Sequence, residues 1–185
     1  MYDESMGRII VVRHGLTDWN EQGKLQGSTD IPLNNNGRKY AKETREILDG
    51  IQFDAAFSSP QIRAMETCEI VLGESGVKIS VEDRLREREY GEYEGKIKGE
   101  FDYKSIWLVK NDGHHGEGVE DIGCLKKRTY ELLDEIKEKY FGKTVLVVTH
   151  GGPARLINYY FNGEPKDGNY FAFTQKHSGF CEYKF

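Results

Sequence analysis

Two histidines stand at positions in this sequence where a folded chain can use them for chemistry. His14 and His150 each lie two residues after the end of a run of four apolar residues and precede a glycine; the two apolar runs are 9–12 and 145–148. Such runs are typical of buried strands, and open α/β sheets bind ligands just beyond the carboxyl ends of their strands. Two neighbouring strands of this kind would bring both imidazoles to one point. The alternative is that both histidines end strands by coincidence and hydrogen-bond only to loops.

Arg13 lies directly before His14 and adds a positive charge to the same strand end. Its planar guanidinium suits a phosphate or a carboxylate group. The glycine after each histidine lets a ligand approach the backbone closely. The residues alone therefore predict a site for an anionic ligand at the edge of a sheet.

The rest of the chain supplies the elements that would position these residues. Apolar periodicity alternates between the strand and helix patterns along the whole sequence, which predicts a layered α/β fold in one domain spanning residues 1–185. Residues 83–100 are charged and rich in turn formers, and 111–116 form a loop. The predicted strands are 8–12, 53–57, 77–81, 145–148 and a closing hairpin of 169–174 with 178–184; the predicted helices are 37–48, 60–72, 101–109, 120–140 and 153–161.

Composition excludes several classes of function. The 185 residues carry a net charge of −5 with 37% hydrophobic residues, which gives no electrostatic footprint for nucleic acid. Residues 1–6 are acidic and lack the apolar stretch of a signal peptide, and no apolar run is long enough for a membrane span. Three widely separated cysteines fit a reducing compartment, so we expect a cytoplasmic protein. Either Met1 or Met6 can be the native start.

Several segments resemble the histidine phosphatase superfamily, in its phosphoglycerate mutase-like branch (branch 1). They occur in the family's order and together span nearly the whole chain, which makes the resemblance far more specific than one Arg-His-Gly tripeptide. The resemblance implies a three-layer α/β sandwich with a mostly parallel central sheet flanked by helices. The segments are RHGLTDWN (13–20), QGSTDIPL (26–33), SSPQIRAMET (58–67), LREREYGEYEG (85–95), Gly116-Glu117 before Asp121, and THGG (149–152).

The resemblance also implies catalytic roles. His14 would attack phosphorus and become a phosphohistidine, while a backbone carbonyl holds its other ring nitrogen. Arg13, Arg63 and His150 would clamp the equatorial phosphoryl oxygens. Glu87 would donate a proton to the leaving oxygen and then activate water. Since arginines and histidines already supply positive charge, we expect neither a metal nor another cofactor.

Substrate contacts are also expected from the same motifs. Asn20 and the Gly151 N–H would complete the phosphate cradle, and Gln26, Gly27, Tyr90 and Lys98 would bind substrate; Trp107 and His115 are weaker candidates for the pocket wall. Without the family pattern, the choice among Glu87, Glu89, Glu92 and Glu94 stays open. The pair His114-His115 has no carboxylate at ligand spacing, so we expect an exposed loop there and not a metal site. His177 is expected to be structural.

Phosphatase and mutase chemistry differ in whether water or a second hydroxyl collects the phosphoryl group. Mutases of the family resemble one another in a longer insertion before the second histidine motif, with an arginine pair that binds the substrate carboxylate. Residues 101–118 contain no arginine, which favours a phosphatase acting on a small-molecule phosphate ester. Lys98 keeps the mutase alternative open, and a catalytically silent binding module is a third. The sequence leaves the oligomeric state open.

Overall fold

The computed structural model describes residues 6–185, so Met1 lies outside the described residues. All five strands belong to one sheet, in the order β3-β2-β4-β1-β5. Neighbouring strands run parallel except β5, which pairs antiparallel with β1 at the edge. The strands are β1 (Arg8–Arg13), β2 (Ala55–Ser58), β3 (Ile79–Val81), β4 (Thr144–Thr149) and β5 (Phe180–Lys184).

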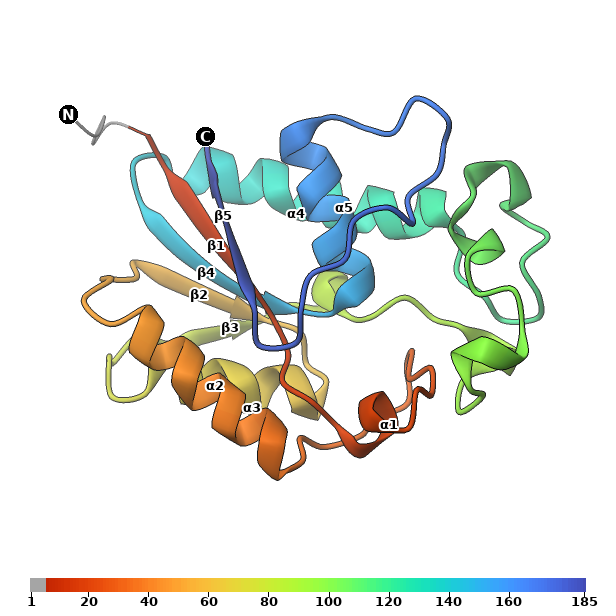
Figure 1. The fold of residues 1–185 in the computed structure, drawn as a ribbon. Coiled ribbons are helices and arrows are strands. Elements are labelled where there is room, and N and C mark those ends of the chain that lie inside the picture. The colour runs from red at the N-terminus through yellow and green to blue at the C-terminus, as the bar shows by residue number, and fades with distance from the viewer. Residues whose placement is uncertain (1–5) are drawn as a thin grey trace.

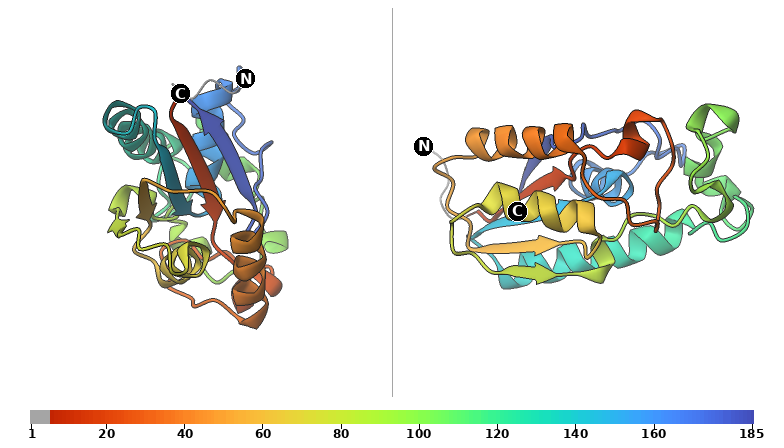
Figure 2. Two further views of the ribbon diagram at one scale, coloured as in Figure 1. Left: turned by 90° about the vertical axis from the view of Figure 1, so that its left-hand side faces the viewer. Right: turned by 90° about the horizontal axis from the view of Figure 1, so that it is seen from below.

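Helices cover both faces of this sheet (Figure 1), and the second view in Figure 2 shows the same layering. Two of them, α2 and α3, pack together on one face, while α4 and α5 pack together on the other. The three-layer α/β sandwich with a mostly parallel sheet is therefore confirmed. The helices are α1 (Asp18–Glu21), α2 (Asn35–Ile47), α3 (Ile62–Leu72), α4 (Ile122–Lys139) and α5 (Gly151–Asn162).

The two apolar runs form the central pair of strands, β1 and β4, in register from Arg8 opposite Thr144 to Arg13 opposite Thr149. Because side chains alternate along a strand, each run fills two cores. Ile9 and Val11 pack into the core beneath α4 and α5, and Ile10 and Val12 into the core beneath α3. Both strands end at the same edge, so His14 and His150 must lie close together.

Two predicted elements are wrong. Residues 101–109 do not form a helix but short 3₁₀ turns, because their carbonyls bind distant partners: that of Ile106 accepts from Arg88, and that of Trp107 from the Tyr170 N–H. Residues 169–174 do not pair with 178–184, since Asn169 bridges Leu108. The 3₁₀ turns are Asp83–Leu85, Gly91–Tyr93, Lys98–Glu100, Ser105–Trp107 and Val109–Asn111.

A third cluster of buried side chains supports the turn-rich segment beyond the strand ends. It contains Tyr90, Trp107 and Tyr170 together with apolar residues of α4 and α5. The segment lies at the right-hand end of the molecule in Figure 1, beyond the strand ends and near α1. Within residues 6–185, no helix combines the length and apolar character needed to cross a membrane.

Candidate active site

A cavity of about 310 Å³ opens beyond the carboxyl ends of β1 and β4. Arg63 and His150 do not line it but are buried beside it: the His150 ring centroid lies 5.0 Å from that of His14, and the charge of Arg63 acts on both histidines. The structure thus brings the predicted catalytic and substrate-binding residues to one place, though not Trp107 and His115, the weaker candidates for the pocket wall. Those that line the cavity are Arg13, His14, Asn20, Gln26, Gly27, Glu87, Tyr90, Lys98 and Gly151.

His14 is held in the form that a nucleophile requires. Its Nδ1 lies 2.7 Å from the Gly15 carbonyl oxygen. Because a carbonyl only accepts, Nδ1 carries the proton and Nε2 keeps its lone pair. Burial, reinforced by the charge of Arg63, lowers the pKa of His14 well below its ordinary value. A Cβ on Gly15 would lie 2.7 Å from the carbonyl oxygen of Gly37, so only glycine allows this turn to approach α2 so closely.

Two arginines present fixed donors beside this imidazole. Arg13 donates through Nη1 to the Gln175 carbonyl at 2.7 Å, and Arg63 through Nη1 and Nη2 to the carbonyls of Thr29 and Gly27, both at 2.9 Å. In each, the buried Nε has no hydrogen-bond partner among residues 6–185. Burial lowers both pKa values, that of Arg63 to about 10, yet both side chains stay charged at neutral pH. Such immobilised, unsatisfied donors suit a phosphoryl group.

His150 adds a hydrogen-bonding ring to the site as the residue that precedes α5. Its Nε2 lies 2.8 Å from the Ser59 hydroxyl, and its Nδ1 is buried with no partner. Burial, followed by the charge of Arg63, lowers the pKa of His150 well below its ordinary value. The ring is therefore neutral and can bind a ligand oxygen through only one N–H.

Glu87 is fixed from one side only. Its Oε1 accepts hydrogen bonds from the N–H of Arg88 at 2.8 Å and the N–H of Gly152 at 2.9 Å. A Cβ on Gly152 would lie 2.4 Å from the same Oε1, so glycine is needed for the carboxylate to sit against the start of α5. Among the described residues, 6–185, no group hydrogen-bonds to Oε2, which leaves this oxygen to exchange a proton with a ligand.

Position separates Glu87 from the three other carboxylates of its segment. Glu94 accepts hydrogen bonds from residues 28–29 and so fixes that loop. Glu92 forms a surface ion pair with a lysine one turn away. Glu89 lines a second cavity of about 410 Å³, which Glu87 also borders. Of these four, only Glu87 lines the cavity that contains His14.

The amides of Asn20 and Gln26 are oriented by one threonine. Thr17 donates through its backbone N–H to Asn20 Oδ1 at 3.1 Å and through its hydroxyl to Gln26 Oε1 at 2.9 Å. Because both amide oxygens accept from Thr17 and both residues line the cavity, their NH₂ groups are the ends left to donate to a ligand. Both residues thus contribute donors, as an anionic ligand requires.

Six residues that line the cavity were not predicted from the sequence, and two residues predicted for the pocket wall do not line it. Trp107 does not line the cavity but lies behind Arg155, whose guanidinium carbon is 4.1 Å from the ring centroid. His115 does not line it either. The missed residues come from segments with no motif, and their chemistry becomes visible only when the fold gathers them; they are Lys24, Leu25, Tyr103, Arg155, Phe171 and Thr174.

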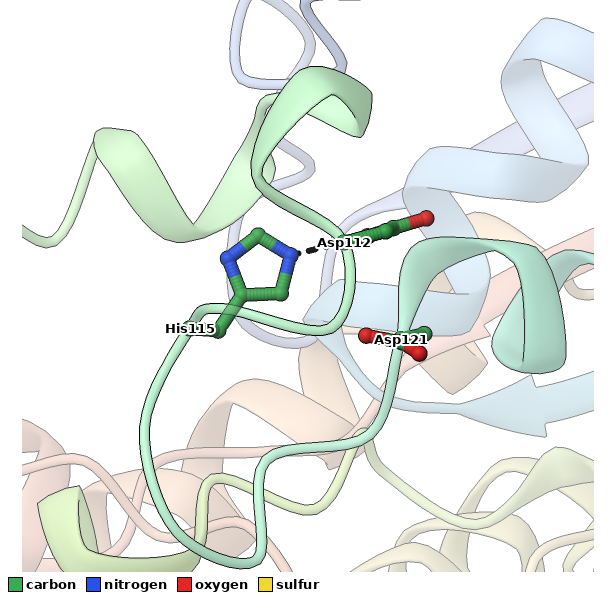
Figure 3. A group of neighbouring side chains, drawn as sticks. All are labelled: Asp112, His115 and Asp121. Atoms are coloured by element: carbon green, nitrogen blue, oxygen red, sulfur yellow. Dashed lines mark hydrogen bonds and ion pairs between the residues drawn. The ribbon is translucent and has the colours of Figure 1, made fainter.

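His115 lies among two carboxylates that sequence spacing did not connect with it (Figure 3). One ligand-type atom from each of Asp112, His115 and Asp121 lies within 4.8 Å of the others. His115 Nε2 is 2.8 Å from Asp112 Oδ1, and the Asp112 carboxylate accepts from the N–H groups of Ile122 and Gly123. These bonds cap the start of α4, whose positive dipole end favours a carboxylate and disfavours a cation. The group therefore ties the loop to α4.

The site imposes a pH dependence on stability. Burial lowers the pKa values of His14, His150 and His177, that of His177 to about 2. In the unfolded chain these histidines therefore bind protons near pH 6.5, whereas in the folded chain they stay neutral at that pH. The free energy of unfolding should fall as pH drops below 6.5, each histidine contributing up to about 1.4 kcal/mol per pH unit.

Urea titrations between pH 7.5 and 5.5 measure this dependence. The His177→Gln variant should show a shallower loss than the wild type, because one neutral, partly buried histidine is removed. The matched His114→Gln variant, changed at an exposed histidine, should follow the wild type. A free energy of unfolding that does not change over this range would contradict the assignment.

Comparisons with known proteins identify the family of this chain. Residues 9–183 match the sequence profile described as "Histidine phosphatase superfamily (branch 1)". The chain is 35% identical over 162 residues to the Bacillus subtilis protein named "Uncharacterized phosphatase PhoE", covering 87% of this chain and 81% of that one. It is also 35% identical over 164 residues to a 2,3-bisphosphoglycerate-dependent phosphoglycerate mutase of Rhizobium meliloti, covering 82% and 77%.

A solved structure gives the same result for the fold. Phosphoserine phosphatase from Entamoeba histolytica, determined with phosphoserine, superposes with a TM-score of 0.83 at 26% identity, covering 97% of this chain and 94% of that one. The family profile spans almost the whole chain, and its relatives bear the names of both phosphatases and mutases. The chain therefore belongs to the histidine phosphatase superfamily, branch 1.

Proposed function

We propose that this protein is a phosphatase that hydrolyses a small phosphomonoester through a phosphohistidine. The observation that carries the proposal is that a neutral His14, whose Nδ1 is bound to a carbonyl, lines the same cavity as Glu87, whose Oε1 is held by two backbone N–H groups. Nucleophile and proton donor can therefore reach one phosphate ester from two directions.

In the first step, Nε2 of His14 attacks phosphorus and the bond from phosphorus to the ester oxygen breaks. Glu87 gives its proton to that oxygen, which leaves as an alcohol, while Arg13, Arg63 and His150 bind the three equatorial oxygens. In the second step, the Glu87 carboxylate takes a proton from water, and the water oxygen displaces Nε2. Orthophosphate leaves, and both side chains return to their starting states.

A phosphatase and a mutase share the first step and differ in the second, in which water or a second hydroxyl takes the phosphoryl group. The absence of arginine from residues 101–118 supports hydrolysis, because that segment offers no pair of guanidiniums to hold the carboxylate of a substrate after the first step. The observation that favours a mutase is the placement of Lys98 in the cavity wall, together with mutase-named relatives. A silent binding module is disfavoured because the residues for both steps are present.

A screen of metabolite phosphates distinguishes these functions. We expect the wild type to release orthophosphate from at least one small phosphomonoester without added metal, in the presence of a chelator. Isomerisation of phosphoglycerate without phosphate release would support the mutase instead. Binding of phosphate esters with neither reaction would support the binding module and overturn the proposed function.

A further inference from the structure

The wall of the catalytic cavity carries more positive charge than one phosphoryl group needs. Arg13, Lys24, Lys98 and Arg155 line it, and Glu87 is the one carboxylate among its lining residues. Among residues 6–185, no acidic side chain forms an ion pair with Lys24, Lys98 or Arg155. This concentration occurs in a chain whose net charge is −5. A phosphoryl group bound to Arg13 and the buried Arg63 leaves the other three cations unneutralised.

Arg155 is the most constrained of these three. It is 4% exposed, and its guanidinium carbon lies 4.1 Å from the ring centroid of Trp107 and 5.2 Å from that of Phe171. In the described part of the chain, Nη2 alone has a hydrogen-bond partner, the Thr174 hydroxyl at 3.2 Å, whereas Nε and Nη1 are buried and unpartnered. Burying a guanidinium without an anion is costly, so a ligand that supplies one would be bound tightly.

A neighbouring arginine shows what a purely structural role looks like in this fold. Arg88 lies 4.8 Å from the same Trp107 ring centroid, and its Nη2 is also buried without a partner, but its Nε and Nη1 donate to the backbone carbonyls of Glu120 and Ile106 and it does not line the cavity. Within residues 6–185, Arg155 donates to no carbonyl. Stacking between the rings of Trp107 and Phe171 therefore orients Arg155, while its Nε and Nη1 donors remain for a ligand.

We propose that Arg155 determines specificity by binding a second anionic group, a carboxylate or a phosphate, on the leaving portion of the substrate. The substrate class is then phosphomonoesters whose alcohol portion is itself negatively charged. Arg155 comes from α5, four residues after Gly151, so the arginine-free segment 101–118 is not needed for this recognition. The inference rests on the proposed phosphatase function, since it concerns the same cavity.

Matched substrate pairs test the inference. One pair is 3-phosphoglycerate and glycerol 3-phosphate, which differ by a carboxylate against a hydroxymethyl group. The other is the bisphosphate and the monophosphate of 1,3-propanediol, so the two pairs distinguish a carboxylate from a phosphate. For each pair, the selectivity is the ratio of kcat/KM for the member with the anionic alcohol portion, called the anionic member, to that for the member whose alcohol portion is uncharged.

We expect the wild type to prefer the anionic member of at least one pair. Arg155→Met keeps an unbranched side chain between the two rings but removes the charge, and should lower that selectivity by a factor on the order of 10². Arg155→Lys keeps the charge without the fork and should recover part of the selectivity. Arg38→Met, at an arginine paired with Glu66 outside the cavity, should leave it unchanged.

Three results would overturn the inference. The first is that the wild type prefers the anionic member of neither pair. The second is that Arg155→Met lowers kcat/KM equally for both members of a pair. The third is that Arg38→Met lowers the selectivity as much as Arg155→Met does. An equal loss for both members would place Arg155 on the transferred phosphoryl group itself. If the wild type hydrolyses no ester, the proposed phosphatase function fails. Calorimetric dissociation constants for the same four compounds, with wild type and Arg155→Met, then test the charge recognition alone.

Discussion

Replacing His14 by alanine is expected to abolish phosphate release, with kcat falling by a factor on the order of 10⁵ or more. The reason is that Nε2 of His14 is the atom that bonds to phosphorus in the proposed mechanism, and no other group in the cavity has an equivalent lone pair. His150 cannot replace it, because its Nε2 lies 2.8 Å from the Ser59 hydroxyl. The remaining donors would still bind phosphate esters without turning them over.

Two measurements check this expectation. The first is kcat for p-nitrophenyl phosphate, beside a phosphate-binding measurement that reports whether the cavity is intact. The second is rapid acid or base quench with a ³²P-labelled substrate, in which the wild type should carry an acid-labile, base-stable phosphoryl group and His14→Ala should carry none. The matched control is His177→Gln, whose ring lies 5.2 Å from that of His14. Retention of phosphoenzyme in His14→Ala would show that another nucleophile acts.

The centre of the fold and of the site could be predicted because each depends on short, local signals. The runs before His14 and His150 became the central strands β1 and β4, and their parallel pairing places both rings 5.0 Å apart. The choice of Glu87 needed the family resemblance, since Glu89 and Glu94 look equivalent in sequence. The structure supplies a physical reason: the N–H of Gly152 holds Glu87 against the start of α5.

The outer wall of the cavity could not be predicted, because long-range contacts decide it. The sequence of residues 101–109 is typical of a helix. Buried Arg88 nevertheless donates to the carbonyl of Ile106, and the segment forms 3₁₀ turns. Residues 169–174 lie alongside those turns and do not pair with β5. Arg155 has no motif of its own, and only the packing of Trp107 and Phe171 around it marks it as a site residue.

Glu87→Gln is expected to lower kcat by a factor on the order of 10² to 10⁴ for an alkyl phosphate, which is the usual contribution of a positioned proton donor. The amide is nearly isosteric, and its oxygen can still accept from the N–H groups of Arg88 and Gly152. The geometry of the site should therefore survive while the proton is lost. Since p-nitrophenolate leaves without protonation, the first step with p-nitrophenyl phosphate should be nearly unaffected.

The second step distinguishes this role from a merely structural one. Water must still lose a proton to attack the phosphohistidine, and glutamine cannot take it, so Glu87→Gln should release one equivalent of p-nitrophenol in a burst and then turn over slowly. The phosphoenzyme should accumulate over the same interval. Glu89→Gln, changed at a carboxylate that lines only the second cavity, should show neither the burst nor the slow phase. The same burst in Glu89→Gln, or steady wild-type turnover in Glu87→Gln, would mean that a different group moves the proton.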